Sequence, residues 1–290
     1  MSTEEGAAIV AQEAARALKR HAFKGRMRIA WRPFLSLLYY LYGRRLLSEV
    51  RSRPRPRHVG IILDGNRRHG RSLGIIEPRL LYELGARKLD EVLDWCVELA
   101  IPTVTLWVFS TENFRRPPEE VSGILESVAA KLTELAADPV IHKRRVRLRA
   151  IGKLALLPEP VAAAIALAEE ATRGYDGMEL NIAVAYGGRQ EITDAVRALL
   201  STMAAGNRSL REAVEEITPE AIARHLYTAG LPDPELIIRT SGEIRLSGFL
   251  LWQSAHSEYY FADVFWPAFR KIDFLRAIRS YQGRQRRLGL

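Results

Sequence analysis

One short segment combines the residue types that a metal-bound diphosphate needs. The segment 58–71 reads HVGIILDGNRRHGR, and an apolar run in it ends where the polar residues begin. These polar residues are Asp64, Gly65, Asn66, Arg67 and Arg68. A carboxylate beside open backbone N–H groups and guanidinium groups suits Mg2+ and phosphate oxygens. Taken alone, the segment could also be an Asp-Gly turn with two solvated arginines.

A second segment, 236–252, again runs from an apolar strand into a polar loop, LIIRTSGEIRLSGFLLW. Its polar residues, with one acid that follows, are Arg239, Thr240, Ser241, Glu243, Arg245, Ser247 and Glu258. Two arginines in a loop rich in Ser and Gly suit bidentate contacts with phosphate oxygens. Alternatively, both arginines could pair with Glu243 on the surface. Together the two segments offer enough cationic groups and candidate metal acids for two diphosphates.

A third segment, FSTENFRRP, follows a strongly apolar run. Its polar residues are Ser110, Thr111, Glu112, Asn113 and Arg116. They are expected at the same edge of a sheet as Asp64, because each group follows directly on a predicted strand. The Ser or Thr of this segment could instead cap a helix.

Short apolar strands alternate with longer helical stretches along the rest of the chain. The predicted strands are 59–63, 103–109, 146–151, 179–185 and 236–238, and the predicted helices are 80–99, 118–137, 158–173, 189–203 and 219–225. Several of these helices begin with Pro, which is favoured in a first turn. The alternation predicts an α/β fold with a mostly parallel central sheet surrounded by helices.

Five blocks in this order resemble the cis-prenyltransferases, the Z-type isoprenyl diphosphate synthases related to undecaprenyl diphosphate synthase. The blocks are HVGIILDGNRR, LWVFSTENFRRP, LNIAVAYGGRQEI, LIIRTSGEIRLSGFLLWQ and SEYYFADVFWP. The resemblance covers 58–290, which is therefore expected to be the catalytic domain with the fold of that family. It implies a Mg2+-dependent condensation of isopentenyl diphosphate with an allylic diphosphate to form a Z-prenyl diphosphate. It also implies a homodimer.

The resemblance assigns roles to particular residues. Asp64 would contact Mg2+, and Glu258 would help with the metal, either in the same chain or from a partner subunit. The backbone of 65–68 and the Arg68 side chain would hold the allylic diphosphate. Arg116, Arg239, Arg245 and Ser247 would hold isopentenyl diphosphate. Further substrate contacts are implied for Asn66, Arg67, His69, Arg79, Tyr82, Ser110, Thr111, Glu112, Phe114 and Leu246.

The Asn of the third segment would lie close to the reacting carbons. An amide is too weak a base to remove a proton unaided, so we expect Asn113 to orient substrate by hydrogen bonding. A diphosphate oxygen or water would then accept the proton.

Several positions depart from the long-chain bacterial pattern of this family. His69 and Phe114 each stand where Trp is usual, and Tyr82 and Ile244 stand where His is usual. An insertion near Gly74 also leaves open whether Arg79 takes the place of the family's helix arginine. These departures bear on phosphate contacts and on the number of metal ions.

Product length depends on the apolar tunnel that would hold the growing chain. The strand 105–109 and the helix positions Val121, Leu125, Val128 and Leu132 are expected to line it, although this spacing is equally that of an ordinary core. Long-chain relatives tend to carry a small residue where this chain has Val108. We therefore expect a short product of the Z-farnesyl type, with undecaprenyl or decaprenyl length as the alternative.

The excess charge lies in the segment 1–57, a basic, aromatic-rich arm with a Pro-rich linker. The chain has a net charge of +9, and this segment holds 13 Lys and Arg against 4 Glu. The stretch WRPFLSLLYYLYG, 31–43, lies between arginines and is too short to span a membrane. Aromatic residues beside arginines suit peripheral contact with anionic lipid, or the stretch packs on protein. The dense apolar stripe disfavours nucleic acid.

The remaining composition narrows the protein class. The single Cys, Cys96, excludes an internal disulfide, and no secretory signal is evident at the start, so a cytoplasmic enzyme is expected. A non-catalytic relative would lack the metal acid and the phosphate loop, both of which are present. A head-to-middle condensing variant stays open, because it would use nearly the same diphosphate sites.

Overall fold

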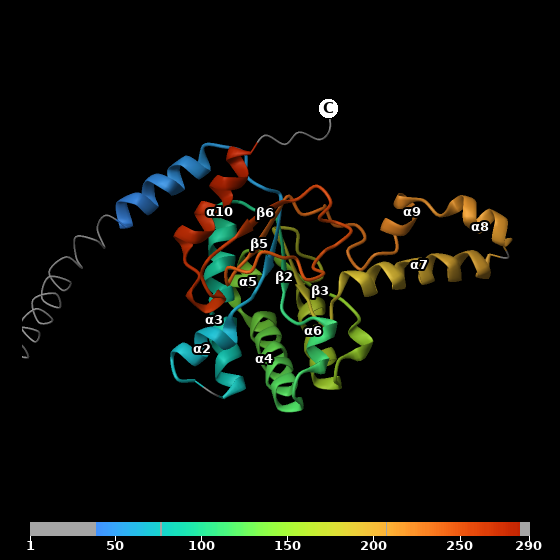
Figure 1. Cartoon of the computed structure of the whole chain (residues 1–290), viewed down its shortest axis with the longest axis horizontal. Helices are drawn as coiled ribbons and strands as arrows, with labels where there is room; N and C mark the ends of the chain where they lie inside the picture. Colours follow the sequence, from blue (N-terminus) through green and yellow to red (C-terminus); the bar gives the residue numbers. More distant parts are fainter. Residues whose placement is uncertain (1–38, 76, 207, 285–290) are drawn as a thin grey trace, which may run out of the picture. The chain divides into compact units, whose positions relative to one another are not determined.

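The computed structural model describes residues 39–75, 77–206 and 208–284 (Figure 1). It divides into two units, up to Glu49 and from Val50 onward. In the first unit, the described residues are helical, and the helix runs on to residue 51. Most of the predicted aromatic stretch 31–43 lies outside the described residues. Within the described ranges, no helix combines the length and apolar character needed to cross a membrane.

The second unit is built on a six-stranded sheet in which every neighbouring pair is parallel, which confirms the predicted fold class. The strand order is β3-β4-β2-β1-β5-β6. The strands are β1 (His58–Ile62), β2 (Thr103–Trp107), β3 (Val146–Ile151), β4 (Met178–Ala183), β5 (Leu236–Arg239) and β6 (Glu258–Phe261). The five predicted strands agree with β1 to β5 within two residues at each end.

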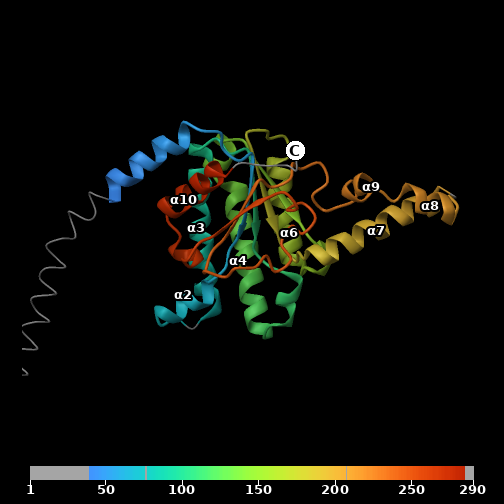
Figure 2. The same ribbon diagram turned by 45° about the horizontal axis from the view of Figure 1, so that its top comes forward.

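The helices agree with the prediction where they are long. They are α2 (Asn66–Ser72), α3 (Pro78–Glu98), α4 (Pro118–Ala137), α5 (Pro139–Lys143), α6 (Glu159–Thr172), α7 (Gly188–Ala205), α8 (Leu210–Glu216), α9 (Pro219–Ala223) and α10 (Lys271–Gly283). Five of these helices and strands lie outside the predicted set: α2, α5, α8, α10 and β6. In Figure 2, α7 leads away from the sheet towards α8 and α9.

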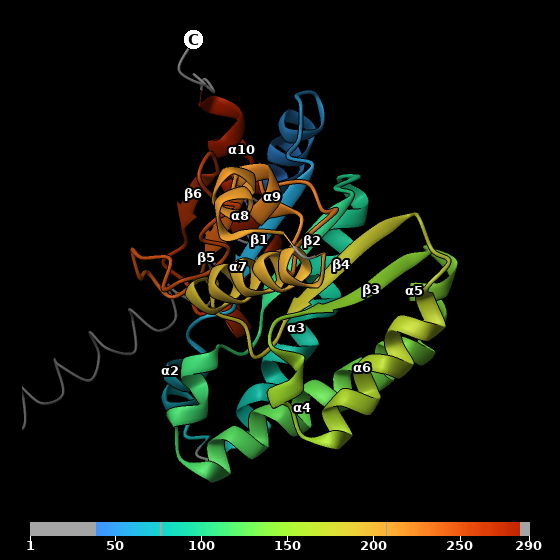
Figure 3. The same ribbon diagram turned by 90° about the vertical axis from the view of Figure 1, so that its right-hand side faces the viewer.

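The two faces of the sheet carry different layers because side chains alternate along each strand. On one face, Leu106 and Ile182 point towards α3 and α4, and Figure 3 shows α3, α4 and α6 together on that side. On the other face, Trp107 and Ala183 form a buried cluster with Phe249 of the loop after β5. At β1, Gly60 leaves room for Phe249, whose ring carbon would lie 3.0 Å from an added Cβ.

The strand order creates the position at which ligands bind in open α/β sheets. From β1 the sheet extends through β2 on one side and through β5 on the other. Where the strand order reverses direction in this way, a crevice lies outside the carboxyl ends of the strands. The three polar segments identified in the sequence follow β1, β2 and β5, so the fold brings them to this one edge.

The first residue of β1, His58, is held neutral by burial, and two hydrogen bonds fix its ring. Its side chain is 1% exposed, and Nδ1 lies 2.6 Å from the carbonyl oxygen of Pro232, which can only accept. The proton is therefore on Nδ1, and Nε2, 2.8 Å away, accepts from the hydroxyl of Thr105. Burial lowers the pKa of His58 to about 4, against smaller opposing effects of the Pro232 hydrogen bond and the Glu235 charge.

We predict an acid-dependent loss of stability that originates at His58. Between pH 6.5 and about 4 the unfolded chain binds a proton that the folded chain does not. The free energy of unfolding should therefore fall by up to about 3 kcal/mol as the pH drops through this window. Urea unfolding at a series of pH values measures the slope. The same slope in a His58→Gln variant would assign it to other groups.

Candidate active site

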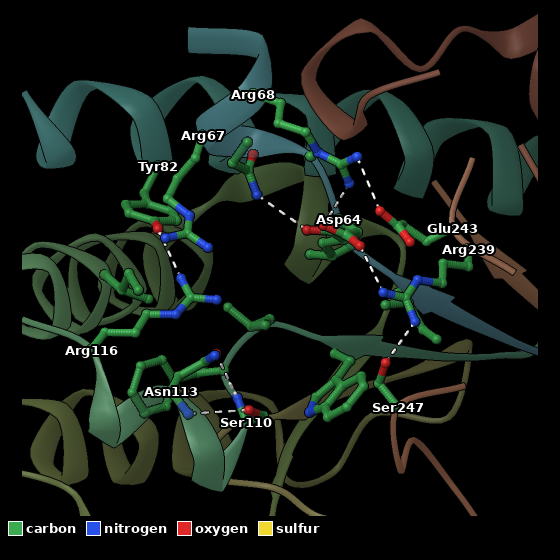
Figure 4. Close-up of a pocket in the computed structure, with 18 of the residues that line it drawn as sticks. Asp64, Arg67, Arg68, Tyr82, Ser110, Asn113, Arg116, Arg239, Glu243 and Ser247 are labelled. Carbon is green, nitrogen blue, oxygen red and sulfur yellow. Dashed lines mark hydrogen bonds and ion pairs between the residues drawn. The ribbon is translucent and has the colours of Figure 1, made fainter. Parts of the chain in front are cut away.

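A pocket of about 580 Å3 lies at the carboxyl edge of the sheet (Figure 4). The three polar segments, α2 and Tyr82 of α3 contribute to it. The predicted residues that line it are Asp64, Gly65, Asn66, Arg67, Arg68, Tyr82, Val108, Ser110, Asn113, Arg116, Arg239, Arg245 and Ser247. Residues as far apart in sequence as Asp64 and Ser247 therefore share one cavity.

The centre of the pocket is an ion pair between Asp64 and Arg239. The Arg239 side chain is only 5% exposed, and its Nη2 lies 2.8 Å from Oδ2 of Asp64. Burial disfavours the charged form of Asp64, but the hydrogen bonds from Arg239 and Ser241 and the charges of Arg239 and Arg68 outweigh it. The pKa of Asp64 is therefore lowered, and its carboxylate is ionised and suitable for a metal.

Backbone contacts fix the position of Asp64. The hydroxyl of Thr240 accepts a hydrogen bond from the backbone N–H of Asp64 at 2.9 Å and donates to its carbonyl at 2.7 Å. Gly65 follows with φ of +103°, and the Phe265 ring would lie 2.6 Å from an added Cβ there. This turn starts α2, whose first bond runs from the His69 N–H to the Gly65 carbonyl. The N–H groups before it can therefore face an anion.

Acidic residues pair with the other arginines on this side of the pocket. Arg68 donates to Ser241 at 2.8 Å and pairs with Glu243 at 3.1 Å, and Glu243 also pairs with Arg245. Arg239 instead donates to the hydroxyl of Ser247 at 2.8 Å. Of the two loop arginines that could pair with Glu243, Arg245 does so, whereas Arg239 pairs with Asp64.

A second cationic cluster forms the opposite side. Arg116 pairs with Glu120 at 2.8 Å and donates to the Tyr82 hydroxyl at 3.2 Å. The same hydroxyl donates to Glu120 at 2.9 Å, and burial raises the pKa of Tyr82 to about 12. Arg67 approaches Glu120 from α2 at 3.5 Å. Tyr82 thus joins α3 to the Arg116 segment as a neutral group.

The third segment forms both a cap and part of the pocket. Asn113 Oδ1 accepts the Ser110 N–H at 2.9 Å, and the Ser110 hydroxyl accepts the Asn113 N–H at 3.2 Å. This reciprocal cap starts the short 3-10 helix Thr111–Arg115. Because the cap uses the oxygen, the Nδ2 group of Asn113 is the part of the amide left to donate to a ligand.

Seven predicted site residues lie outside the pocket lining: His69, Arg79, Thr111, Glu112, Phe114, Leu246 and Glu258. His69 and Phe114 pack on the aromatic rings of Phe265 and Phe109, with centroid distances of 6.2 and 4.9 Å. The Thr111 hydroxyl lies 3.3 Å from Glu112. Leu246 packs on the buried cluster behind the sheet. Arg79 pairs with Glu83 on the exposed face of α3.

Glu258 lies at the other edge of the sheet from Asp64. It is the first residue of β6 and pairs with Leu236, the first residue of β5, whereas Asp64 follows the end of β1. Its carboxylate pairs with Arg284. Within one chain, the structure does not bring the two acids together.

Three charged residues of the site were not among the predicted site residues. Arg71 and Glu243 line the pocket, and Glu120 joins Arg67, Arg116 and Tyr82. Arg67 and Arg71 share one face of α2, since they are four residues apart. The sequence analysis did not identify this shared face, because it did not predict the short helix α2.

The residues fit a magnesium ion bound together with a diphosphate. Among the described residues, no group of three or more His, Cys, Asp or Glu side chains could hold a metal ion. Mg2+ commonly binds through one or two carboxylates, with phosphate oxygens and water as the other ligands. Ionised Asp64, beside a turn of backbone N–H groups and arginines, matches that donor set.

Comparison with known proteins agrees with this chemistry. Residues 62–289 match the prenyltransferase family model described as undecaprenyl diphosphate synthase. The chain is 58% identical over 252 residues to the isoprenyl transferase of Thermus thermophilus, covering 87% of this chain and 95% of that protein. The chain belongs to the undecaprenyl diphosphate synthase family of prenyltransferases. As a member of this family, it is an enzyme that transfers prenyl groups.

Two further relatives of this prenyltransferase are informative. The (2Z,6E)-farnesyl diphosphate synthase of Thermobifida fusca is 53% identical, covering 87% of this chain and 97% of that protein. A crystal structure of lavandulyl diphosphate synthase from Lavandula x intermedia, in complex with dimethylallyl diphosphate, superposes with a TM-score of 0.74. It is 32% identical and covers 81% of this chain and 98% of that chain.

We predict that Asp64→Ala abolishes turnover. If the Asp64 carboxylate holds a metal against a leaving diphosphate, its loss should lower prenyl transfer by at least 100-fold. Incorporation of labelled isopentenyl diphosphate measures the rate, and circular dichroism checks the fold. Near-normal turnover of a folded Asp64→Ala variant with Mg2+ would refute the metal role.

Proposed function

We propose that this prenyltransferase joins isopentenyl diphosphate to an allylic diphosphate and forms a Z double bond. The observation that carries the proposal is the continuity of two cavities. The cationic pocket shares Leu63, Asn66, Tyr82, Val108 and Ile124 with a second, apolar cavity between α3 and α4. A prenyl diphosphate matches these two cavities, because its charged end needs cationic groups and its hydrocarbon tail needs apolar walls.

Different residues bind the two diphosphates. Arg68 and the first N–H groups of α2 bind the allylic diphosphate beside Asp64. Arg116, Arg239, Arg245 and Ser247 bind isopentenyl diphosphate. Mg2+, when bound, supplies positive charge to the leaving diphosphate and so lowers the barrier to its departure. Arg239 keeps Asp64 ionised, and the Thr240 hydroxyl fixes its backbone.

Asn113 lines the cationic pocket, and Val108, which precedes it on the same stretch of chain, lines both cavities. The Nδ2 group orients isopentenyl diphosphate while its double bond attacks the allylic carbon and the allylic diphosphate leaves. A diphosphate oxygen accepts the proton that the new carbon chain loses, since an amide has no useful basicity. The Ser110 cap keeps the Asn113 side chain in position during this step.

The apolar cavity supports a short product. Its volume is about 70 Å3, whereas a cavity of about 150 Å3 accommodates one benzene ring. Its walls include Leu106, Val108, Ile124, Val128 and Leu132, while the expected Val121 and Leu125 lie outside its lining. We therefore propose a product of about three isoprene units.

Product analysis tests the function directly. Purified protein is incubated with Mg2+, labelled isopentenyl diphosphate and dimethylallyl, geranyl or farnesyl diphosphate, and the dephosphorylated products are sized by chromatography. A Z-configured product of about three units supports the proposal. Products of ten or eleven units would favour the long-chain alternative, and joining of two allylic units would favour the head-to-middle variant. No incorporation with any starter would contradict the function.

Val108 is expected to limit product length. It lines both cavities, so the growing tail must pass it. A branched side chain at this joint costs strain to displace. Val108→Ala should lengthen the products by at least one unit, and Val108→Phe should shorten them or stop elongation. An unchanged distribution for both variants would show that another residue limits length.

We also propose that the chain forms a homodimer and that the arm attaches to anionic lipid. In full-length protein, replacing Arg26, Arg28, Arg32, Arg44 and Arg45 by Ala should weaken sedimentation with phosphatidylserine vesicles at least tenfold. Turnover of soluble substrates serves as the control and should not change. Equal vesicle binding by both forms would refute the lipid contact.

A sedimentation-velocity mass of one chain would refute the dimer.

A further inference from the structure

The apolar cavity follows two neighbouring helices from the diphosphate pocket to a buried ion pair. Near the pocket, Tyr82 of α3 bonds Glu120 of α4. Further along, Asp90 of α3 pairs with Lys131 of α4. The helices therefore run in the same direction, and the cavity between them extends from Ile124 to Lys131.

Lys131 is an unusual residue for the wall of an apolar cavity. Its side chain is 9% exposed, and its Nζ lies 2.7 Å from Oδ1 of Asp90 and 3.0 Å from Glu134. The two acids are much more exposed, with 48% and 63% of their side chains accessible. The ion pair thus has an inner, lysine side towards the cavity and an outer, acidic side towards water.

A polar groove runs along the outer side of α3 and α4, from Arg79 and Glu83 near the pocket to this ion pair. It is lined by charged residues of α3 and α4, including Arg87, Asp90 and Glu134. The groove and the apolar cavity share Ala86, Ser127 and Lys131. Since Ala86 and Ser127 are small, Lys131 is the large side chain between the two spaces.

Building on the function proposed above, we propose that the Lys131 ion pair closes the far end of the tunnel and stops elongation of the prenyl chain. Lys131 is then a specificity-determining residue that acts together with Val108. Val108 controls entry into the cavity, and Lys131 controls its depth.

The physical basis is that apolar side chains of the tunnel cost less free energy to displace than the Lys131 ion pair. Apolar side chains along the tunnel can rearrange around a hydrocarbon tail, which replaces the contacts that it disturbs. At Lys131, a tail that advances further would break a largely buried ion pair without offering any polar partner. Removing the partner of a buried charge is strongly unfavourable.

The depth of the tunnel agrees with a short product. Ile124 and Lys131 are seven residues apart on α4, which corresponds to roughly 10 Å of helix. An isoprene unit adds four backbone bonds of about 1.5 Å each, or roughly 5 Å when extended. This length matches about two units beyond the entrance, in addition to the unit at the reacting carbons, once the apolar walls of the cavity of about 70 Å3 move apart around the tail.

Product sizing of three variants tests this role. Lys131→Ala removes the ion pair and opens the cavity to the polar groove, so the main product should lengthen by one or more units. Asp90→Ala releases Lys131 towards Glu134 and water and should lengthen products as well, without shortening the wall residue. Lys131→Arg retains charge and bulk and should leave the length unchanged.

Lys88→Ala is the matched control. Lys88 of α3 is, like Lys131, a largely buried lysine, paired with Glu91 at 2.7 Å, and it lines neither the cavity nor the groove. Its product length should equal that of the wild type. Folding is checked by circular dichroism, and Asp90→Ala decides the question if Lys131→Ala does not fold.

The outcomes separate this inference from the function on which it rests. An inactive wild type would contradict the function itself. Folded, active Lys131→Ala and Asp90→Ala variants with the wild-type product length would overturn the role of the ion pair. The same lengthening in Lys88→Ala would also overturn it, because the effect would then follow from general loosening of α3 and α4.

Discussion

Arg239 carries a permanent positive charge on a side chain that is almost fully enclosed, and Asp64 is the carboxylate that compensates it. Without this partner, the buried guanidinium would be strongly destabilising. The pair links the carboxyl ends of β1 and β5, and the Thr240 hydroxyl fixes the backbone of Asp64 beside it. The same carboxylate is the one suited to a metal. Charge balance within the fold and the chemistry of the pocket therefore depend on one ion pair.

In the rest of the site, the charged groups and the apolar walls lie in separate regions. Arginines gather around the Asp64 end, where Glu243 and Glu120 balance them. Tyr82 stays uncharged at the boundary, since burial raises the pKa of its hydroxyl to about 12. Beyond Val108, the walls are mainly apolar until Lys131. A substrate with a doubly charged head and a hydrocarbon tail has one orientation that satisfies both regions.

Sequence patterns predicted the parts of this structure that have strong local signals. The buried strands and the long helices were predicted within a few residues, and the three polar segments do share one edge. The pattern gave no signal for α2, because seven residues containing Gly70 are too few to show helical periodicity. As a result, Arg71 was not predicted. The edge strand β6 has only four half-buried residues, so it was not predicted, and neither was the position of Glu258 at the opposite edge. The α3 wall of the cavity depends on helix packing, which sequence spacing alone does not specify.

The central claim is that Asp64 couples the buried charge of Arg239 to a metal-bound diphosphate. Isothermal titration with an allylic thiodiphosphate, a substrate analogue that reacts very slowly, tests it most directly in the presence and absence of Mg2+. The account predicts that Mg2+ tightens binding to the wild type at least tenfold and that Asp64→Asn removes most of this gain while the protein stays folded. An equal effect of Mg2+ on both proteins would contradict it.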